Sequence, residues 1–147
     1  MGRPIAFKGA YFVLLYMCDD NNIRIISMAY DVENIFAKIL REEIPCDKVF
    51  ENEHVLAFKD VQPQAPVHIL VIPKGAYIDM DDFSARATDV EIVAYTHAVG
   101  QIARELGVKD TGYRILSNCG VDSGQEVPHL HIHILGGKTL GPIVSTS

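Results

Sequence analysis

The chain contains no tryptophan and only three cysteines, Cys18, Cys46 and Cys119. The cysteines are odd in number and form no CxxC pair, so the sequence predicts neither a disulfide framework nor a cysteine zinc site. This usage is typical of a reducing, cytoplasmic compartment. The most apolar run, residues 9–17, is shorter than the roughly 20 residues that span a bilayer, and we expect no membrane partner.

Basic residues are also scarce. The 13 Lys and Arg residues face 19 Asp and Glu residues, which gives a formal charge of −6. A protein without a basic stripe cannot neutralise many phosphates, so we expect no nucleic-acid partner. With 147 residues, 48% of them hydrophobic and 22% charged, the chain has the size and composition of one folded domain.

Residues 1–27 differ from the rest of the chain. Their apolar run follows Arg3 and Lys8 as in a signal peptide, but large residues stand where a cleavage site would need small ones. We interpret residues 1–27 as an upstream leader or an over-long start, with an extra strand or arm that packs on the body as the alternative. We predict a single domain over residues 28–147.

The body shows two helical patterns and five strand-like runs. Apolar residues recur at helical spacing in residues 35–40 and stop before Pro45. A longer stripe predicts a helix over residues 88–106, which Gly107 would end. The strand-like runs cover residues 48–52, 55–58, 67–72, 113–117 and 129–135. Hairpin-length links between neighbouring strands predict an α+β fold with a mainly antiparallel sheet.

Three histidines, His129, His131 and His133, alternate with aliphatic residues in the run HLHIHIL. The side-chain period of a strand is two, so the three imidazoles would share one face. A lone buried histidine is usually a satisfied core residue. Three on one face impose a burial cost that aliphatic residues avoid, so the pattern predicts a chemical site.

This site has two chemical interpretations. In the first, a histidine pair at i and i+2 binds zinc with a third ligand from elsewhere. In the second, one imidazole attacks phosphorus while its neighbours set its tautomer and protonate the leaving group. Residues 118–125 precede the histidines and offer backbone and side-chain amides that suit phosphate oxygens, which favours the second interpretation.

The run NCGVDSGQEVPHLHIHILGG resembles the signature of the histidine-triad (HIT) family. The runs QPQAPVHILVIPK and IFAKILREEIP resemble its nucleotide-binding branch, the purine nucleoside phosphoramidases. The resemblance covers residues 30–138 and implies a HIT-like fold whose sheet continues across a homodimer, with the long helix near the interface. It implies no cofactor and no metal. Many members carry a tryptophan near the C-terminus that reaches the partner's site, and this chain has none.

The resemblance also implies roles for individual residues. His131 would attack the α-phosphorus and form a nucleotidyl-histidine that water then hydrolyses. His129 and His133 would orient or polarise the nucleophile and the phosphate, and His68 would support them from a neighbouring strand. Asp60 would accept both ribose hydroxyls. The further nucleotide-binding positions would be Val61, Asn118, Gly124, Gln125, Glu126, Phe36, Ile39, Ile44 and Phe58.

Three of these positions have a second interpretation. Phe36 and Ile39 lie on a helix stripe that serves core packing equally well. Glu126 stands where some members carry serine, and a carboxylate would repel a transferring phosphoryl group unless it is protonated or turned toward a leaving amine. A base pocket with aliphatic and phenyl walls recognises the shape of the base more than its hydrogen-bonding groups, so the preference for purines would be weak.

The resemblance favours metal-free hydrolysis of the P–N bond of purine nucleoside 5'-phosphoramidates. A dinucleoside polyphosphate hydrolase is the nearest alternative, although the Gly-Gly at residues 136–137 is more similar to the phosphoramidase branch. A nucleotide-binding regulatory module with little catalysis is another alternative, and the three retained histidines argue against it. Zinc binding is the remaining one.

Overall fold

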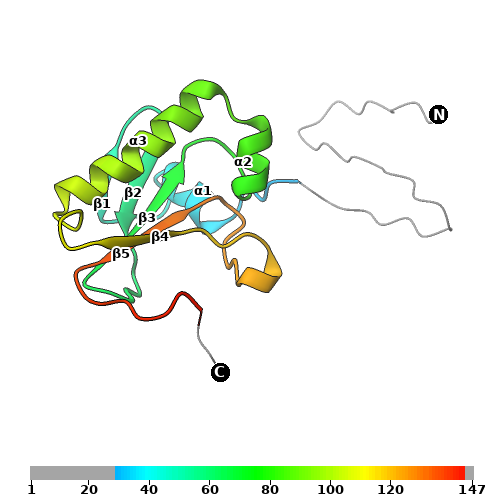
Figure 1. Ribbon diagram of the computed structural model, residues 1–147. Helices are drawn as coiled ribbons and strands as arrows, with labels where there is room; N and C mark the ends of the chain where they lie inside the picture. The colour runs from blue at the N-terminus through cyan, green and yellow to red at the C-terminus, as the bar shows by residue number, and fades with distance from the viewer. Residues whose placement is uncertain (1–28, 145–147) are drawn as a thin grey trace, which may run out of the picture.

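The computed structural model describes residues 29–144, and the predicted leader at residues 1–27 lies outside the described residues. The described chain forms an α+β fold with one antiparallel five-stranded sheet, in the order β1-β2-β3-β5-β4 (Figure 1). This confirms the predicted fold class. The strands are β1 Lys48–Glu51, β2 Val55–Lys59, β3 Val67–Pro73, β4 Tyr113–Leu116 and β5 Ile132–Gly136. The helices are α1 Ile35–Leu40, α2 Met80–Arg86 and α3 Asp89–Glu105, with a 3-10 helix, η1, at Val121–Ser123.

The sheet is buried on both faces, because α3 covers one face and α1 covers part of the other. In β2, Val55 packs in a cluster with Ile102 of α3, whereas the next residue, Leu56, packs with Phe36 of α1. These four side chains are at most 6% exposed. Burial on both faces explains why β2 and β3 are continuous apolar runs rather than alternating ones.

Helix α3 confirms the helix predicted over residues 88–106, and its ends have clear causes. The Thr88 hydroxyl accepts a hydrogen bond from the Glu91 N–H, and the Glu91 carboxylate accepts one from the Thr88 N–H, which is a capping box. Gly107 follows the helix with a φ of 72° and ends it. Helix α1 occupies the predicted range and is capped by the Asn34 side chain.

Helix α2 is an element that the sequence pattern does not predict. It has seven residues, begins after the side-chain cap of Asp79 and buries only Asp82 and Phe83. Two turns with one buried apolar residue are too short to show a helical period.

The strand predicted over residues 129–135 is wrong at its start, since β5 begins at Ile132. The preceding backbone is hydrogen-bonded outside the sheet. The His129 N–H donates to the Val127 carbonyl at 2.8 Å, and the Leu130 N–H donates to the Tyr77 carbonyl at 2.7 Å. Two of the three motif histidines therefore lie in a tethered loop rather than in the strand.

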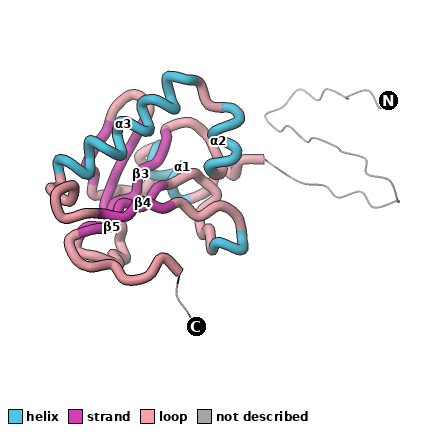
Figure 2. The backbone as a smooth tube through the Cα atoms, viewed as in Figure 1, coloured by secondary structure: helices cyan, strands magenta, loops and turns pink. Residues whose placement is uncertain are grey.

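Strands β3 and β5 lie side by side although they are far apart in sequence. Figure 2 shows the long connection that contains η1 and leads from β4 into β5. The Gln125 side chain in this connection donates to the carbonyl of Ile78, just before α2, and so ties the loop to the body. Among the described residues, no helix combines the length and the apolar character that membrane crossing demands.

Candidate active site

The pairing of β3 with β5 brings His68 and His133 together. The register places His68 opposite Leu135 and Leu70 opposite His133, so the two histidines lie diagonally on the same face of the sheet. Their rings are 5.1 Å apart between centroids, and Nε2 of His68 lies 2.8 Å from Nδ1 of His133. Leu70 belongs to the cluster under α1, so this is the α1 face.

The other two motif histidines reach the same side from the loop ahead of β5. The Phe36 ring of α1 makes edge contacts with His129 and His131, at centroid distances of 6.2 and 5.2 Å. The rings of His131 and His133 are 5.0 Å apart. The three imidazoles thus gather beneath α1, although only His133 lies in the regular strand.

The protonation of His131 follows from its backbone contact. Its Nδ1 lies 2.7 Å from the His129 carbonyl oxygen. A carbonyl only accepts hydrogen bonds, so Nδ1 carries the proton and Nε2 keeps its lone pair. Burial lowers the pKa of His131 below its usual value, which keeps the ring neutral at pH 7. Nε2 of His131 is therefore a nucleophilic nitrogen whose tautomer the backbone selects.

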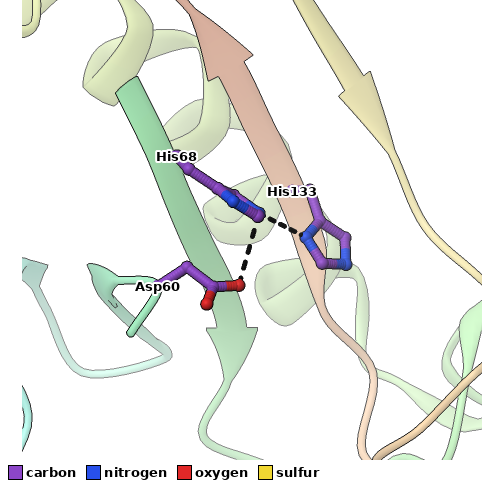
Figure 3. A group of neighbouring side chains, drawn as sticks. All are labelled: Asp60, His68 and His133. Atoms are coloured by element: carbon purple, nitrogen blue, oxygen red, sulfur yellow. Dashed lines mark hydrogen bonds and ion pairs between the residues drawn. The ribbon is translucent and has the colours of Figure 1, made fainter. Parts of the chain in front are cut away.

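A second chain of hydrogen bonds fixes the tautomers of His68 and His133 (Figure 3). Nδ1 of His68 accepts from the Gln64 N–H at 3.1 Å, so the proton of the neutral His68 ring is on Nε2. His68 Nε2 then donates to Nδ1 of His133, and Asp60 Oδ2 lies 3.3 Å from His68 Nε2. The proton of His133 is consequently on Nε2.

Both histidines of this hydrogen-bond network are neutral at pH 7. Burial lowers the pKa of His133 to about 4, with further lowering by the nearby His131 and His68. Burial also lowers the pKa of His68, against the opposing effect of the Asp60 carboxylate. The arrangement leaves His133 Nε2–H as a hydrogen-bond donor beside the His131 ring, and this donor can polarise a phosphate or protonate a leaving group.

His129 is held by both of its ring nitrogens. Nε2 donates to the Pro73 carbonyl at 2.9 Å, and Nδ1 accepts from the Tyr30 hydroxyl. The residue is fully buried, and burial lowers its pKa to about 4. The ring is therefore occupied away from His131, and the part of His129 that contacts the His131 ring nitrogen is its carbonyl. The motif gives no sign of Tyr30, which lies about 100 residues earlier in the chain.

The donor set does not suit a metal ion. Asp60, His68 and His133 place one ligand atom each within 4.8 Å of one another, but the Gln64 N–H holds His68 with a proton on the nitrogen that a metal would need. The zinc pairs at i and i+2 are disfavoured by the partners of His131. Both ring nitrogens of His129 are hydrogen-bonded, and Nδ1 of His133, its unprotonated nitrogen, accepts from His68.

An apolar cleft of about 450 Å³ opens beside Asp60. Of the predicted base-pocket residues, Ile39, Ile44 and Phe58 line this cleft. Phe36 does not line it, since Phe36 is 6% exposed and packs edge-on against Phe58 and His131. The other residues that line it are Ile35, Pro45, Cys46, Asp47, Lys59, Asp60 and Val61. Ile35 is an apolar residue that α1 leaves 47% exposed, so its part in the cleft is visible from the structure and not from the sequence pattern.

Asp60 lies where the cleft meets the histidines. Its Oδ1 accepts from the Gln62 N–H at 2.8 Å, and its Oδ2 faces His68 at 3.3 Å. The side chain is 17% exposed, so its oxygens remain within reach of a ligand in the cleft. Val61, at 93% exposure, stands at the rim. The predicted ribose position thus lies between the predicted base and phosphate positions.

The loop before β5 owes its shape to glycines and to Gln125. Gly120 and Gly124 have φ values of 78° and 75°, which side-chain-bearing residues rarely adopt. Gln125 Oε1 accepts from the Gly120 N–H at 2.8 Å, and its Nε2 donates to the carbonyls of Ile78 and Val127 at 2.8 and 3.0 Å. Gln125 therefore holds the loop together rather than offering a free amide.

The other two predicted residues of this loop differ in exposure. Asn118 is half-buried and Glu126 is exposed. The Glu126 carboxylate raises the pKa of His131 against the larger effect of burial, which means that it lies within electrostatic range of the His131 ring.

Comparison with known proteins shows the family of this chain. The HIT domain matches residues 41–140. An uncharacterized HIT-like protein of Azospirillum brasilense is 63% identical over 82% of this chain and 98% of its own length. The purine nucleoside phosphoramidase of Escherichia coli is 43% identical over 77% of this chain and 94% of its own.

Solved structures show the same likeness. A histidine triad protein from Clostridium difficile is 47% identical, covers 78% of this chain and 98% of its own, and superposes with a TM-score of 0.69. A HIT family hydrolase from Clostridium thermocellum is 38% identical over 77% of this chain and 97% of its own, with a TM-score of 0.70. The fold, the three histidines under α1 and these matches lead to one assignment: the chain belongs to the HIT domain family.

Proposed function

We propose that the protein hydrolyses purine nucleoside 5'-phosphoramidates through a nucleotidyl-histidine on His131. One observation carries the proposal. The His129 carbonyl, 2.7 Å from His131 Nδ1, leaves a neutral imidazole with its lone pair on Nε2, and this is the form of histidine that attacks phosphorus. The family assignment and the Escherichia coli phosphoramidase relative support it.

The reaction has two displacements. His131 Nε2 forms a bond to the α-phosphorus while the P–N bond breaks, and the leaving amine takes a proton from His133 Nε2. Water then attacks the phosphorus of the nucleotidyl-histidine and returns a proton to His133 Nε2, and the bond to His131 breaks. The products are a nucleoside monophosphate and an amine, and both histidines return to their starting tautomers.

The cleft beside Asp60 supplies the binding part of the proposal. Its apolar walls suit the two faces of a purine. The Asp60 carboxylate accepts hydrogen bonds from both ribose hydroxyls. The loop of residues 118–125 receives the phosphate through donors other than the N–H groups of Gly120, Gly124 and Gln125, which are bonded within the loop. The shape of the base, rather than its hydrogen-bonding edge, sets the substrate preference, so adenosine and guanosine phosphoramidates are both substrates.

The test is steady-state hydrolysis of a fluorogenic adenosine phosphoramidate. The unmutated protein turns it over with or without a chelator, and His131→Ala abolishes turnover while AMP still binds. His97→Ala is the matched control, because His97 is exposed on α3, away from the cleft. Turnover that survives in His131→Ala would refute the nucleophile.

A covalent intermediate gives a second readout. Acid quenching during turnover, followed by mass spectrometry, traps the nucleotidyl group on the peptide that contains His131. No turnover of phosphoramidates, with hydrolysis of dinucleoside polyphosphates, would assign the protein to the alternative activity. Binding of AMP without turnover of either substrate would favour the regulatory module.

We also propose that the working form is a homodimer in the cytoplasm. Strand β4 pairs only with β5 among the described strands, and it exposes Tyr113 and Ile115 at 40% and 52%. Such an edge is a surface for pairing with a second copy. Cys46 and Cys119 are free, as a reducing compartment would keep them. Light scattering on the unmutated protein and on Ile115→Lys tests the dimer.

A further inference from the structure

The contact between Tyr30 and His129 joins the start of the described chain to the motif. The Tyr30 hydroxyl is hydrogen-bonded to His129 Nδ1, and the two rings meet edge-on with centroids 5.5 Å apart. We propose that Tyr30 is a positioning residue, whose hydroxyl fixes His129 so that the His129 carbonyl holds His131 in its reactive tautomer. The inference rests on the proposed function, to which it adds a residue outside the histidine motif.

The direction of each hydrogen bond follows from its partners. The Pro73 carbonyl accepts from His129 Nε2 at 2.9 Å, so Nδ1 of a neutral His129 has no proton and needs a donor. His129 is 0% exposed, which excludes solvent as that donor. The Tyr30 hydroxyl fills this role, and burial, which raises the pKa of Tyr30, keeps it protonated.

The constraint reaches His131 through the backbone. The His129 N–H is held by the Val127 carbonyl at 2.8 Å, its ring by Pro73 and Tyr30, and its carbonyl accepts from His131 Nδ1 at 2.7 Å. Without the hydrogen bond from Tyr30, the His129 ring is less constrained. The orientation of the His129 carbonyl then becomes less fixed as well. A weaker bond from His131 Nδ1 lets the proton move to Nε2, and the nucleophilic lone pair is then lost.

The geometry separates this role from substrate binding. Tyr30 does not line the apolar cleft, and its hydroxyl is directed at His129 rather than at the cleft. Removing the hydroxyl should therefore change the chemical step and leave nucleotide affinity unchanged.

The main test is Tyr30→Phe, which removes one oxygen atom. We expect kcat for an adenosine phosphoramidate to fall about tenfold, with Kd for AMP within about twofold of the unmutated value. Tyr95→Phe is the matched control. Tyr95 is 2% exposed and its hydroxyl donates to the Val71 carbonyl at 2.7 Å, but it packs in the cluster under α3, on the other face of the sheet. It should lose stability and keep kcat.

Nitrogen-15 NMR of the histidine rings reads the tautomers in the free protein, without any turnover. In the unmutated protein the His131 signals are those of a ring protonated at Nδ1, and those of His129 show protonation at Nε2. In Tyr30→Phe the His131 signals move toward the other tautomer. If the unmutated protein fails to hydrolyse phosphoramidates, this readout still decides whether Tyr30 sets the tautomer.

A double-mutant cycle tests whether Tyr30 acts through His129. In His129→Gln the amide nitrogen can still donate to the Pro73 carbonyl, but no acceptor remains at the position of the Nδ1 that Tyr30 contacts. Both single variants should lower kcat by similar factors, and Tyr30→Phe/His129→Gln should be no worse than either one. If Tyr30→Phe does not fold, His129→Gln with Tyr30 intact still provides the kcat and NMR measurements.

Three results would overturn the proposal. The first is a Tyr30→Phe variant with unchanged kcat and an unchanged His131 tautomer. The second is multiplication of the two losses in the double variant, which would show independent action. The third is an equal loss of kcat in Tyr95→Phe, which would reduce the effect of Tyr30 to general destabilisation.

Discussion

Nε2 of His68 donates a hydrogen bond to Nδ1 of His133 across 2.8 Å, from the central strand β3 to its neighbour β5. The backbone N–H of Gln64 sets the direction of this bond, because it occupies the other nitrogen of His68. The bond places the proton of His133 on Nε2, next to His131, whose own tautomer is fixed by the His129 carbonyl. Two separate hydrogen-bond chains therefore set the tautomers of these two histidines.

Removing His68 should damage the proton donor more than the nucleophile. In His68→Leu, His133 loses the partner that fixes its tautomer, and protonation of the departing amine becomes inefficient. We expect kcat to fall about 100-fold for an alkylamine leaving group, which needs a proton, and less than about tenfold for an activated arylamine, which needs it less. Steady-state kinetics with the two substrates measure the difference.

The control for His68 is His97→Leu, which removes an exposed histidine from α3 and should leave both rates unchanged. Equal losses of kcat for the two leaving groups in His68→Leu would contradict the assigned role, because a donor of protons must discriminate between them.

The pH dependence of kcat/KM should reflect His131. Only the neutral ring attacks phosphorus, and burial lowers the pKa of His131, so the acid limb of the profile should lie below the usual histidine value of 6.5. Asp60 raises that pKa, which means that Asp60→Asn should move the limb to lower pH while it weakens nucleotide binding. Asp110→Asn, at an exposed site, should not move the limb. A limb that shifts upward in Asp60→Asn would contradict this electrostatic account.

Long elements in which the burial pattern repeats several times were predicted well from the sequence. The 17 residues of α3 repeat their buried side over several turns, and a capping box and a glycine mark its ends. The triad was recognisable because residues two apart in HLHIHIL stay on one side even where the backbone leaves the strand. Helix α2 was missed because seven residues with one buried apolar side chain have no readable period.

The hydrogen-bond partners of the site left no such signal. Tyr30 and His129 are 99 positions apart, so no spacing rule links them. Gln64 is only four residues before His68, but it binds through a backbone N–H, which its residue type does not indicate. Gln125 was expected at the phosphate, and its place in a glycine loop gave no sign that three backbone groups already engage its amide. Residue type indicated the chemistry, whereas the hydrogen-bond partners came only from the fold.

Stability should fall in mild acid because the buried histidines, among them His129, must take up protons. The pKa of the fully buried His129 ring is about 4 in the folded protein, against an ordinary value of 6.5. The contribution of the neutral His129 ring to the free energy of unfolding is complete above pH 6.5. It is lost as pH falls from 6.5 toward 4, by up to about 3 kcal/mol. Urea unfolding at pH 7.0, 6.0 and 5.0 measures most of this range while carboxylates remain ionised. His129→Gln is less stable at pH 7 and should show a flatter dependence on pH; an equally steep slope would contradict the assignment.

The last prediction concerns the loop that should receive the phosphate. Gln125→Ala removes the side chain that bonds the Gly120 N–H and the carbonyls of Ile78 and Val127. Leaving these groups without partners costs about 1–3 kcal/mol where water cannot replace them, and the loop becomes free to move. KM for a phosphoramidate should rise about tenfold while the His131 tautomer, read by nitrogen-15 NMR, stays the same.

The matched control for the loop is Gln101→Ala on α3. That glutamine is exposed and donates only to Glu105, so its removal should leave KM and the free energy of unfolding unchanged within about 0.5 kcal/mol. Hydrogen exchange should show faster exchange in residues 118–125 of Gln125→Ala and in no segment of Gln101→Ala. If Gln125 instead contacts phosphate directly, KM rises with no change in exchange, because the loop would keep its shape without that side chain.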